Sequence, residues 1–251
     1  DVQWVQFDEP FLALDLTEKE KKAFSYVYGE IKKEFPSLKT LLATYFEGLH
    51  ENASLVTSLP ICALHIDLVR NPEQLDDLLS IVPEKMSLSL GVIDGRNIWI
   101  NDYAKSLSHI EKAVARLTKN RVMIAPSCSL LHSPCDLDLE TDEHILIHEI
   151  KKWMSFAKQK LRELSELNEI AESNNRQSDA FIKNQQAIED RRTSPLIHNT
   201  DVKKRVTAIT DADAKRKSVF SIRKKKQQAH LKLPQFPTTT IGSFPQTSEV
   251  R

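Results

Sequence analysis

The sequence predicts an α/β protein that forms part of a parallel barrel. Five short runs rich in Leu, Ile and Val alternate with amphipathic helical stretches over residues 1–170. Buried parallel strands have this composition, and each parallel pair needs a crossover connection about as long as a helix. Five strands followed by a long helix predict the later part of a (β/α)8 TIM-type barrel, followed by a helical linker and the start of a second domain.

The five predicted strands are short and apolar. They are Trp4–Phe7, Thr40–Tyr45, Cys62–Leu68, Ser87–Ile93 and Arg121–Pro126. The first strand begins close to Asp1, with no lead-in and no initiator Met. We therefore expect the chain to be a segment of a longer protein.

Three helices have clear signals. Thr17 and Glu20 form a capping-box pair, and the helix that they open is expected to end before Pro36. A second helix should follow Asn101–Asp102 and run to about Leu117. A third is predicted as one long helix from Asp142, because apolar residues recur there at helical spacing. These residues are Leu146, Ile150, Trp153, Ala157, Leu161 and Leu164.

Composition argues against several classes of partner. Lys plus Arg and Asp plus Glu both number 35, so net charge predicts binding to neither nucleic acid nor an anionic membrane. No apolar run approaches the length of a membrane span. Three cysteines, Cys62, Cys128 and Cys135, have no paired spacing and fit a reduced, cytoplasmic protein.

The character of the chain changes after about Leu167. Residues 172–200 are polar, and residues 201–226 contain ten Lys and Arg against three Asp. This run predicts linking helices with a solvated basic face, or a surface that binds RNA or a polyanionic ligand tail. Its only aromatic residue, Phe220, argues against a platform for stacking bases.

Beyond the basic run, Pro234 and Pro237 demand extended chain, and Thr238–Ile241 is predicted as a strand. The predicted divisions are 1–170, 171–230 and 231–251. The turn at Ile241, Gly242 and Ser243 has two interpretations. It is a plain β-turn, or its N–H groups and hydroxyl hold a carboxylate.

Polar side chains follow each predicted strand. Because the carboxyl ends of parallel strands meet at one edge, they could form a metal or acid–base site there. The alternative is that they cap helices and tie loops together. No CxxC, HExxH or Gly-rich phosphate loop is present. The candidates are Asp8, Glu9, Tyr45, Phe46, Glu47, Asp67, Arg70, Asp94, Arg96, Asn97, Ser127, Cys128, Ser129 and His132.

Six strings, in order along the whole chain, resemble the cobalamin-independent methionine synthases, the 5-methyltetrahydropteroyltriglutamate–homocysteine methyltransferases. They are WVQFDEP at 4–10, TYFEG at 44–48, LHIDLV at 64–69, GVIDGRNIW at 91–99, APSCSLLHSP at 125–134 and LPQFPTTTIGSFPQT at 233–247. The resemblance implies two barrels joined by a linker, of which the second is catalytic. Residues 1–170 would be the later half of the first barrel, and 231–251 the first strand of the second.

The resemblance also implies a reaction and its partners. The family moves a methyl group from 5-methyltetrahydropteroyltri-L-glutamate to homocysteine, whose sulfur binds zinc as a thiolate. Ile241, Gly242 and Ser243 would contact the amino-acid portion of homocysteine. The full-length protein is expected to be a monomer.

The resemblance places no zinc ligand and no catalytic residue in this chain. At the positions analogous to the family's His-x-Cys pair stand Leu42 and Thr44, while Asp67 and Cys128 lie near the other two. One thiol and one carboxylate do not make a thiolate-rich zinc site. We therefore expect Asp67 and Cys128 to be structural, and the isolated chain to be inactive.

Two other functions remain open at this stage. The chain could be a non-catalytic module that supports a catalytic barrel and holds the folate tail. It could also be a different barrel enzyme that uses Asp8, Glu9 and Cys128 directly.

Overall fold

The computed structural model describes residues 2–238, 242 and 247–248. The chain forms two compact units, Asp1–Ser194 and Pro195–Arg251. The first unit contains the sheet and most of the helices.

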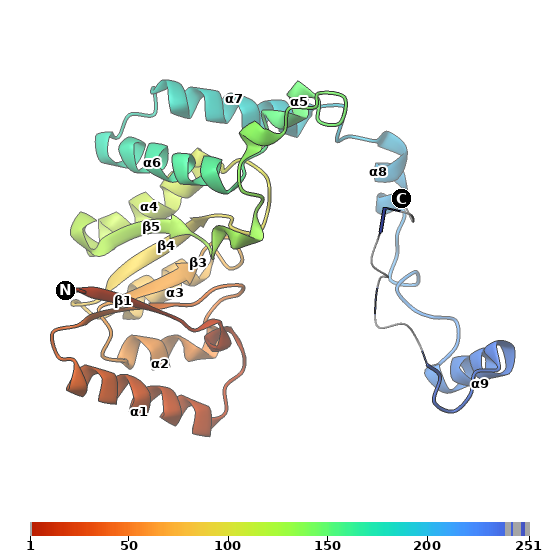
Figure 1. Cartoon of the computed structure of the whole chain (residues 1–251), viewed down its shortest axis with the longest axis horizontal. Coiled ribbons are helices and arrows are strands. Elements are labelled where there is room, and N and C mark those ends of the chain that lie inside the picture. Colours follow the sequence, from red (N-terminus) through yellow and green to blue (C-terminus); the bar gives the residue numbers. More distant parts are fainter. Residues whose placement is uncertain (1, 239–241, 243–246, 249–251) are drawn as a thin grey trace. The chain divides into compact units, whose positions relative to one another are not determined.

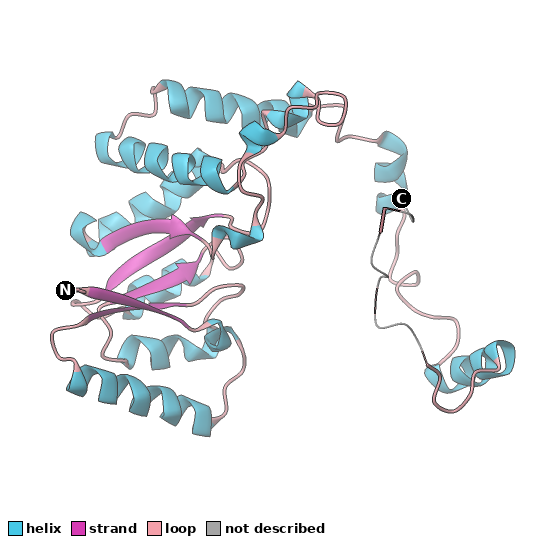
Figure 2. Cartoon of the chain, in the orientation of Figure 1, coloured by secondary structure: helices cyan, strands magenta, loops and turns pink. Residues whose placement is uncertain are grey.

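The sheet has five parallel strands in the sequential order β1-β2-β3-β4-β5, which confirms the predicted α/β class (Figures 1 and 2). All five predicted strands are present, with ends within two residues of the prediction. They are β1 Trp4–Asp8, β2 Lys39–Ala43, β3 Ala63–Asp67, β4 Ser87–Ile93 and β5 Val122–Pro126.

Burial differs sharply between the middle and the edges of the sheet. Every residue of β3 is buried, whereas β1 alternates between exposed and half-buried residues and β5 is half-buried throughout. Among the described residues, β1 pairs only with β2, and β5 only with β4. The sheet therefore has two edges whose backbone groups are open to a further strand.

Helices follow the strands and cover the sheet. In the first unit they are α1 Glu18–Glu34, α2 Ala53–Ser58, α3 Gln74–Ile81, α4 Tyr103–Leu117, α5 His148–Lys151, α6 Ala157–Ser173 and α7 Asp179–Thr193. Figure 1 shows α1 and α2 near the β1 end of the sheet, and α4 and α6 near the β5 end. The core between sheet and helices includes Leu64, Ile66, Leu88, Leu90 and Leu107.

The predicted boundaries of α1 and α4 are confirmed. Thr17 and Glu20 form the capping box, and the helix ends at Glu34, just before Pro36. The Asp102 carboxylate accepts the N–H of Lys105 at 3.3 Å, and α4 runs to Leu117.

The single long helix predicted from Asp142 is wrong. The chain instead forms the short α5, leaves the helical path and re-enters a helix at Ala157. Between them, the carbonyl of Trp153 accepts the N–H of Ile100, and the N–H of Ser155 donates to Ile98. Pairing with the segment after β4 replaces the helical bonds, and Leu161 is consequently 57% exposed rather than part of an apolar stripe.

Helix α7 lies in the polar region 172–200 and belongs to the first unit. Ala180 and Phe181 pack against the core, and Asn184 donates to the carbonyl of Asn101 at 2.7 Å. The predicted divisions at 170/171 and 230/231 stay predictions.

The described part of the second unit contains α8 Thr200–Thr207 and α9 Phe220–Leu231. All their residues are exposed except Arg223 of α9, which is half-buried. The predicted strand Thr238–Ile241 lies outside the described residues except for Thr238, which is exposed. Within the described chain, no helix has both the length and the apolar character needed to cross a bilayer.

Candidate functional site

One face of the sheet lines a cavity of about 300 Å³, which extends from the middle of the strands to the residues just after them. Most of its lining is small or polar, and all five strands or the residues just after them contribute. The lining comprises Gln6, Asp8, Leu41, Ala43, Tyr45, His65, Ser89, Ala125, Pro126, Cys128 and Ser129.

Asp8 and Glu9 point to different surroundings. Asp8 lines the cavity, where its carboxylate accepts bonds from Gln6 Nε2 at 2.7 Å and from the Tyr45 hydroxyl at 3.2 Å. Burial and the nearby Asp8 raise the pKa of Tyr45. Glu9 instead accepts the Tyr28 hydroxyl of α1 at 3.0 Å. The two carboxylates therefore have separate partners on different elements.

Asp67 is buried and holds backbone rather than a ligand. One carboxylate oxygen accepts the N–H groups of Val69 and Arg70, at 3.0 and 2.9 Å, and the other accepts the N–H of Phe46 at 3.1 Å. Three charge-assisted bonds to amides tie two loops together. The Arg70 side chain is exposed.

The β2 positions assigned by analogy to zinc ligands do not line the cavity. Leu42 is fully buried in the hydrophobic core, whereas Leu41, Ala43 and Tyr45 line the cavity. Because side chains alternate along a strand, Thr44 also faces away from the cavity-lining set. Neither Leu42 nor Thr44 is therefore among the side chains that line this cavity.

Cys128 is a buried thiol with few polar partners. Its Sγ lies 3.8 Å from the Ser129 carbonyl and 4.0 Å from the Ser127 hydroxyl. A Cβ on Gly95 would lie 2.9 Å from this sulfur, so glycine is needed for the close contact. Burial raises the pKa of Cys128 above its ordinary value. The thiol therefore resists forming the thiolate that binds metals or attacks substrates.

His65 lines the cavity but is not among the residues predicted from the strand ends. Its Nε2 lies 3.2 Å from the Ser127 carbonyl, which can only accept, so Nε2 carries the proton. Nδ1 then accepts the Ser89 hydroxyl at 3.0 Å. Burial lowers the pKa of His65 and favours this neutral form. The sequence does carry a sign of this residue, because His65 is a polar side chain between the apolar Leu64 and Ile66 of β3. It lies beside Ser89 on β4.

A cluster of aromatic and cationic side chains lies just beyond the carboxyl ends of the strands. The Arg96 guanidinium lies 4.6 Å from the centre of the Phe46 ring, and the rings of Tyr45 and His132 approach Phe46 edge-on. Phe46 has a φ of 79°, in the left-handed region that a bulky residue rarely adopts.

Neighbouring polar residues close turns. Asp94 accepts the N–H of Arg96 at 2.8 Å and the Asn97 amide at 2.8 Å. Glu47 accepts the N–H of Gly48, and lies 3.7 Å from His50. These contacts match the alternative in which strand-end polar groups organise loops.

The donors at this edge do not fit a zinc ion. Within the described residues, no group of three or more His, Cys, Asp and Glu side chains is placed to hold a metal. Asp67 already accepts three backbone N–H groups. Tetrahedral zinc needs several free thiolate, imidazole or carboxylate donors.

Other predicted site residues fall elsewhere. Ile241 and Ser243 lie outside the described residues, and Gly242 is exposed. The basic side chains of residues 203–226 are almost all exposed. Lys204 pairs with Asp201 at 3.7 Å, within the same helix. This exposure matches the solvated face and leaves a polyanion-binding role untested.

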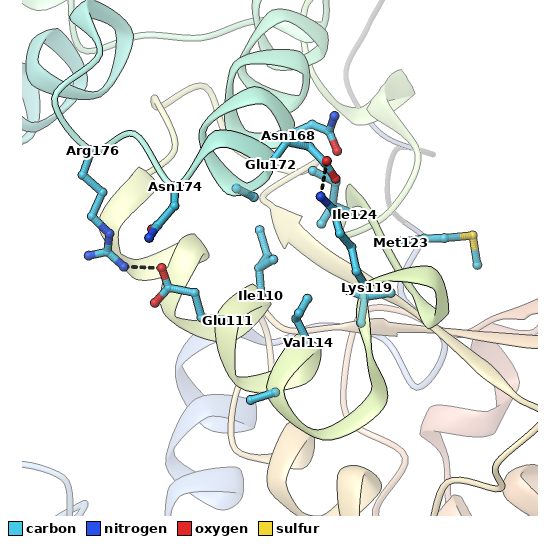
Figure 3. A pocket seen from close by; sticks show the side chains of 13 residues that line it. Ile110, Glu111, Val114, Lys119, Met123, Ile124, Asn168, Glu172, Asn174 and Arg176 are labelled. Carbon is cyan, nitrogen blue, oxygen red and sulfur yellow. Dashed lines mark hydrogen bonds and ion pairs between the residues drawn. The ribbon is translucent and has the colours of Figure 1, made fainter.

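A larger groove of about 1000 Å³ lies along the free edge of β5 (Figure 3). Three consecutive residues of β5 line it, namely Val122, Met123 and Ile124. Consecutive side chains of a strand point to opposite faces of the sheet, so a groove that all three line follows the open side of β5. Helices α4 and α6 form its walls. Ion pairs Glu111–Arg176, at 2.6 Å, and Lys119–Glu172 lie at its rim.

Residues 1–118 match the family model described as the N-terminal domain of cobalamin-independent synthase. Three relatives carry the name 5-methyltetrahydropteroyltriglutamate–homocysteine methyltransferase. The protein of Flavobacterium johnsoniae is 53% identical, over 100% of this chain and 33% of its own length. That of Cytophaga hutchinsonii is 50% identical, over 99% and 33%. That of Coxiella burnetii is 47% identical, over 100% and 32%. The chain spans about a third of the length of these relatives.

Proposed function

We propose that this chain, which belongs to the cobalamin-independent methionine synthase family, is part of a methyltransferase that makes methionine from homocysteine. The methyl donor in this proposal is 5-methyltetrahydropteroyl-polyglutamate. The observation that carries the proposal is 53% identity over the whole chain to a relative named for this reaction. The other two relatives, with the same name, also align over nearly all of the chain.

The proposed role of residues 1–170 is the later half of a (β/α)8 barrel. Strict sequential order of parallel strands supports it, and so do the free edges of β1 and β5, where closure would add strands. The groove beside β5 gives such a strand room. Residues 231–251 are proposed to begin the catalytic barrel.

Zinc is the proposed cofactor, bound outside this chain. A thiol substrate needs help to become a thiolate near neutrality, and a bound metal supplies that help. Cys128 and Asp67 are poor candidates for its ligands, for the reasons given above. The proposed contact to the amino-acid part of homocysteine is Ile241, Gly242 and Ser243, where N–H groups and a hydroxyl suit a carboxylate.

A chimera tests this function. The aligned third of the Flavobacterium johnsoniae relative is replaced by residues 1–251, and methionine formation is measured with homocysteine and the methyl-folate triglutamate. The expected activity is within about tenfold of the parent, because half of the exchanged residues are identical. A chimera that folds, as judged by circular dichroism, yet forms no methionine would refute the proposal.

A second candidate function is a non-catalytic module that holds the polyglutamate tail. The observation in its favour is the exposed basic side chains of residues 203–226, with one ion pair among them in the described part of the chain. A short chain of carboxylates is a chemically suitable ligand for such a surface.

A further inference from the structure

Three loops bring Tyr45, Phe46, Arg96 and His132 together beyond the carboxyl ends of β2, β4 and β5. In this strand-end cluster, the Arg96 guanidinium lies 4.6 Å from the centre of the Phe46 ring. The ring centres of Tyr45 and His132 lie 4.7 and 5.6 Å from that of Phe46, with their rings edge-on. Small-molecule sites are lined mostly by apolar and aromatic side chains with a few placed polar groups. The cluster therefore has the composition of a binding site.

The backbone beneath the cluster holds an unfavourable conformation. Phe46 has a φ of 79°, and the buried Asp67 carboxylate accepts its N–H at 3.1 Å. A bulky residue in the left-handed region is strained, and such residues concentrate at functional sites. A glycine would adopt this conformation without strain but would offer no ring to Arg96. The strain therefore indicates a role for the Phe46 side chain.

Hydrogen bonds also fix the other two loops of the cluster. The N–H of Gly95 donates to the Ser127 hydroxyl at 3.2 Å. The Ser133 hydroxyl donates to the Gly95 carbonyl at 3.1 Å, which ties the loop that carries His132 to the loop that carries Arg96. Because the backbone is already in place, a ligand can bind here with little ordering of the protein.

The Arg96 guanidinium supplies the polar donors of this site. Across the described residues it forms no hydrogen bond and no ion pair, so its N–H groups remain open to a ligand. Contact with the Phe46 ring holds the guanidinium in place and leaves its planar fork available to a carboxylate. The exposed His132, which contacts the same ring, adds a ring N–H donor.

The charge of the surrounding loops selects the kind of anion. Three carboxylates each accept a hydrogen bond from a member of the cluster, and they belong to Asp8, Asp67 and Asp94. They repel a dianion such as inorganic phosphate more than a monoanion, because Coulomb repulsion scales with the charge of the ligand. A single carboxylate also matches the planar fork of Arg96.

The cluster adjoins the cavity of about 300 Å³ described above. Tyr45 belongs to both, and Gly95, the residue before Arg96, lies in close contact with Cys128 of the cavity lining. Part of that lining is apolar, namely Leu41, Ala43, Ala125 and Pro126. The site therefore offers apolar surface to the body of an organic ligand beside the donors for its charge.

We propose that the strand-end cluster binds a small organic monocarboxylate. Arg96 and His132 hold the carboxylate, and the apolar body of the ligand lies against Phe46 and the adjoining cavity. Every residue of this site lies in the first unit, so binding does not depend on the proposed methyltransferase function.

Binding of phenylacetate to the whole chain tests this site. Phenylacetate joins one carboxylate to an apolar ring, and phenylacetamide is its neutral counterpart. Nuclear magnetic resonance follows the backbone amide shifts of Phe46 and Arg96. Phenylacetate should move them saturably, with a dissociation constant on the order of 1 mM for so small a ligand. Phenylacetamide and inorganic phosphate should bind at least about tenfold more weakly.

Three variants test the role of the guanidinium. Arg96→Gln removes the charge and should weaken phenylacetate binding at least about tenfold. Arg96→Lys keeps the charge but loses the planar fork, and should weaken binding at least about threefold. Arg70→Gln is the matched control, because Arg70 is an exposed arginine that follows the neighbouring strand β3. It should leave binding unchanged.

Several outcomes would overturn the proposal. One is the absence of a saturable shift with both phenylacetate and hexanoate up to about 50 mM. Another is phenylacetate binding that Arg96→Gln leaves unchanged, or that Arg70→Gln weakens equally. Phenylacetamide that binds as tightly as phenylacetate, or phosphate that binds more tightly, would likewise contradict a site for an organic carboxylate.

Discussion

The Asp67 carboxylate accepts the backbone N–H of Phe46 at 3.1 Å and so holds an aromatic residue at a φ of 79°. The same carboxylate accepts two further amides from its own turn. Asp67 ends β3, where a sequence pattern predicts a catalytic acid, yet in the fold it holds two loops together. Its bonding capacity is directed to the loop that displays Phe46 beside Arg96 and His132.

Asp67→Asn should destabilise the protein. The amide offers one neutral acceptor oxygen to three buried or half-buried N–H groups, and leaving such donors unsatisfied costs about 2 kcal/mol of unfolding free energy. Urea denaturation measures the change. The exposed Asp77→Asn on α3 is the control and should shift the unfolding free energy by less than about 0.5 kcal/mol. An equal effect in both variants would mean that the three bonds contribute nothing specific.

The three cysteines should react with iodoacetamide in the order of their exposure. Cys135 is exposed and Cys62 is half-buried, whereas Cys128 is buried with a raised pKa. Thiolate is the reactive form, so at pH 7.5 Cys128 should be alkylated at least about tenfold more slowly than Cys135. Peptide mass spectrometry over a time course measures the rates. Preferential labelling of Cys128 would show an activated thiol and contradict its structural role.

Glu163 should make stability fall with rising pH. Burial raises its pKa in the folded chain from 4.5 to about 7, so between these values the folded state binds more protons than the unfolded state. The unfolding free energy then decreases as pH rises through this window, by at most about 3 kcal/mol. Comparing chemical denaturation at pH 5 and pH 8 should show the loss in the parent chain.

Glu163→Gln supplies the control for that pH dependence. The variant cannot ionise, so it should lose less stability than the parent between pH 5 and pH 8. An identical loss in both chains would assign the effect to other groups.

Replacing Lys224, Lys225 and Lys226 with Ala should leave the melting temperature unchanged. These side chains are exposed on α9, and in the described part of the chain none of them lies within ion-pair distance of a carboxylate. The same variant separates the two functions of the basic run. Isothermal titration with pteroyltriglutamate should show no change if the run is a solvated face. Weaker, salt-sensitive binding, with no loss in a Lys19, Lys22 and Lys33 triple variant of α1, would favour the tail-binding module.

Local patterns predicted the parts of the fold that local physics controls. Strand positions followed from short apolar runs, and α1 followed from the Thr17–Glu20 pair and Pro36. The helix predicted from Asp142 failed because its break depends on a distant segment. The N–H of Ile100 donates to the Trp153 carbonyl, and the N–H of Ser155 donates to the Ile98 carbonyl. The sequence near Asp142 carries no sign of that pairing.

The site was predictable in position but not in role. Parallel strands placed Asp8, Asp67 and Cys128 near one edge, as expected. Their roles depend on which neighbours saturate them, and those neighbours lie far away in sequence, as Tyr45 does from Asp8. The side of the sheet that Leu42 and Thr44 face could not be predicted either, since only the pairing of β2 with its neighbours fixes which side chains point inward.

Zinc content after dialysis tests most directly whether the edge residues of this chain are structural rather than a thiolate–metal centre. Purified residues 1–251 are loaded with excess zinc, dialysed against metal-free buffer and measured by atomic emission, together with Cys128→Ser. We expect less than about 0.1 equivalent in both chains, because Asp67 already accepts three backbone N–H groups and the described residues place no three His, Cys, Asp or Glu side chains to hold a metal. One equivalent retained by the parent chain and lost in Cys128→Ser would contradict it.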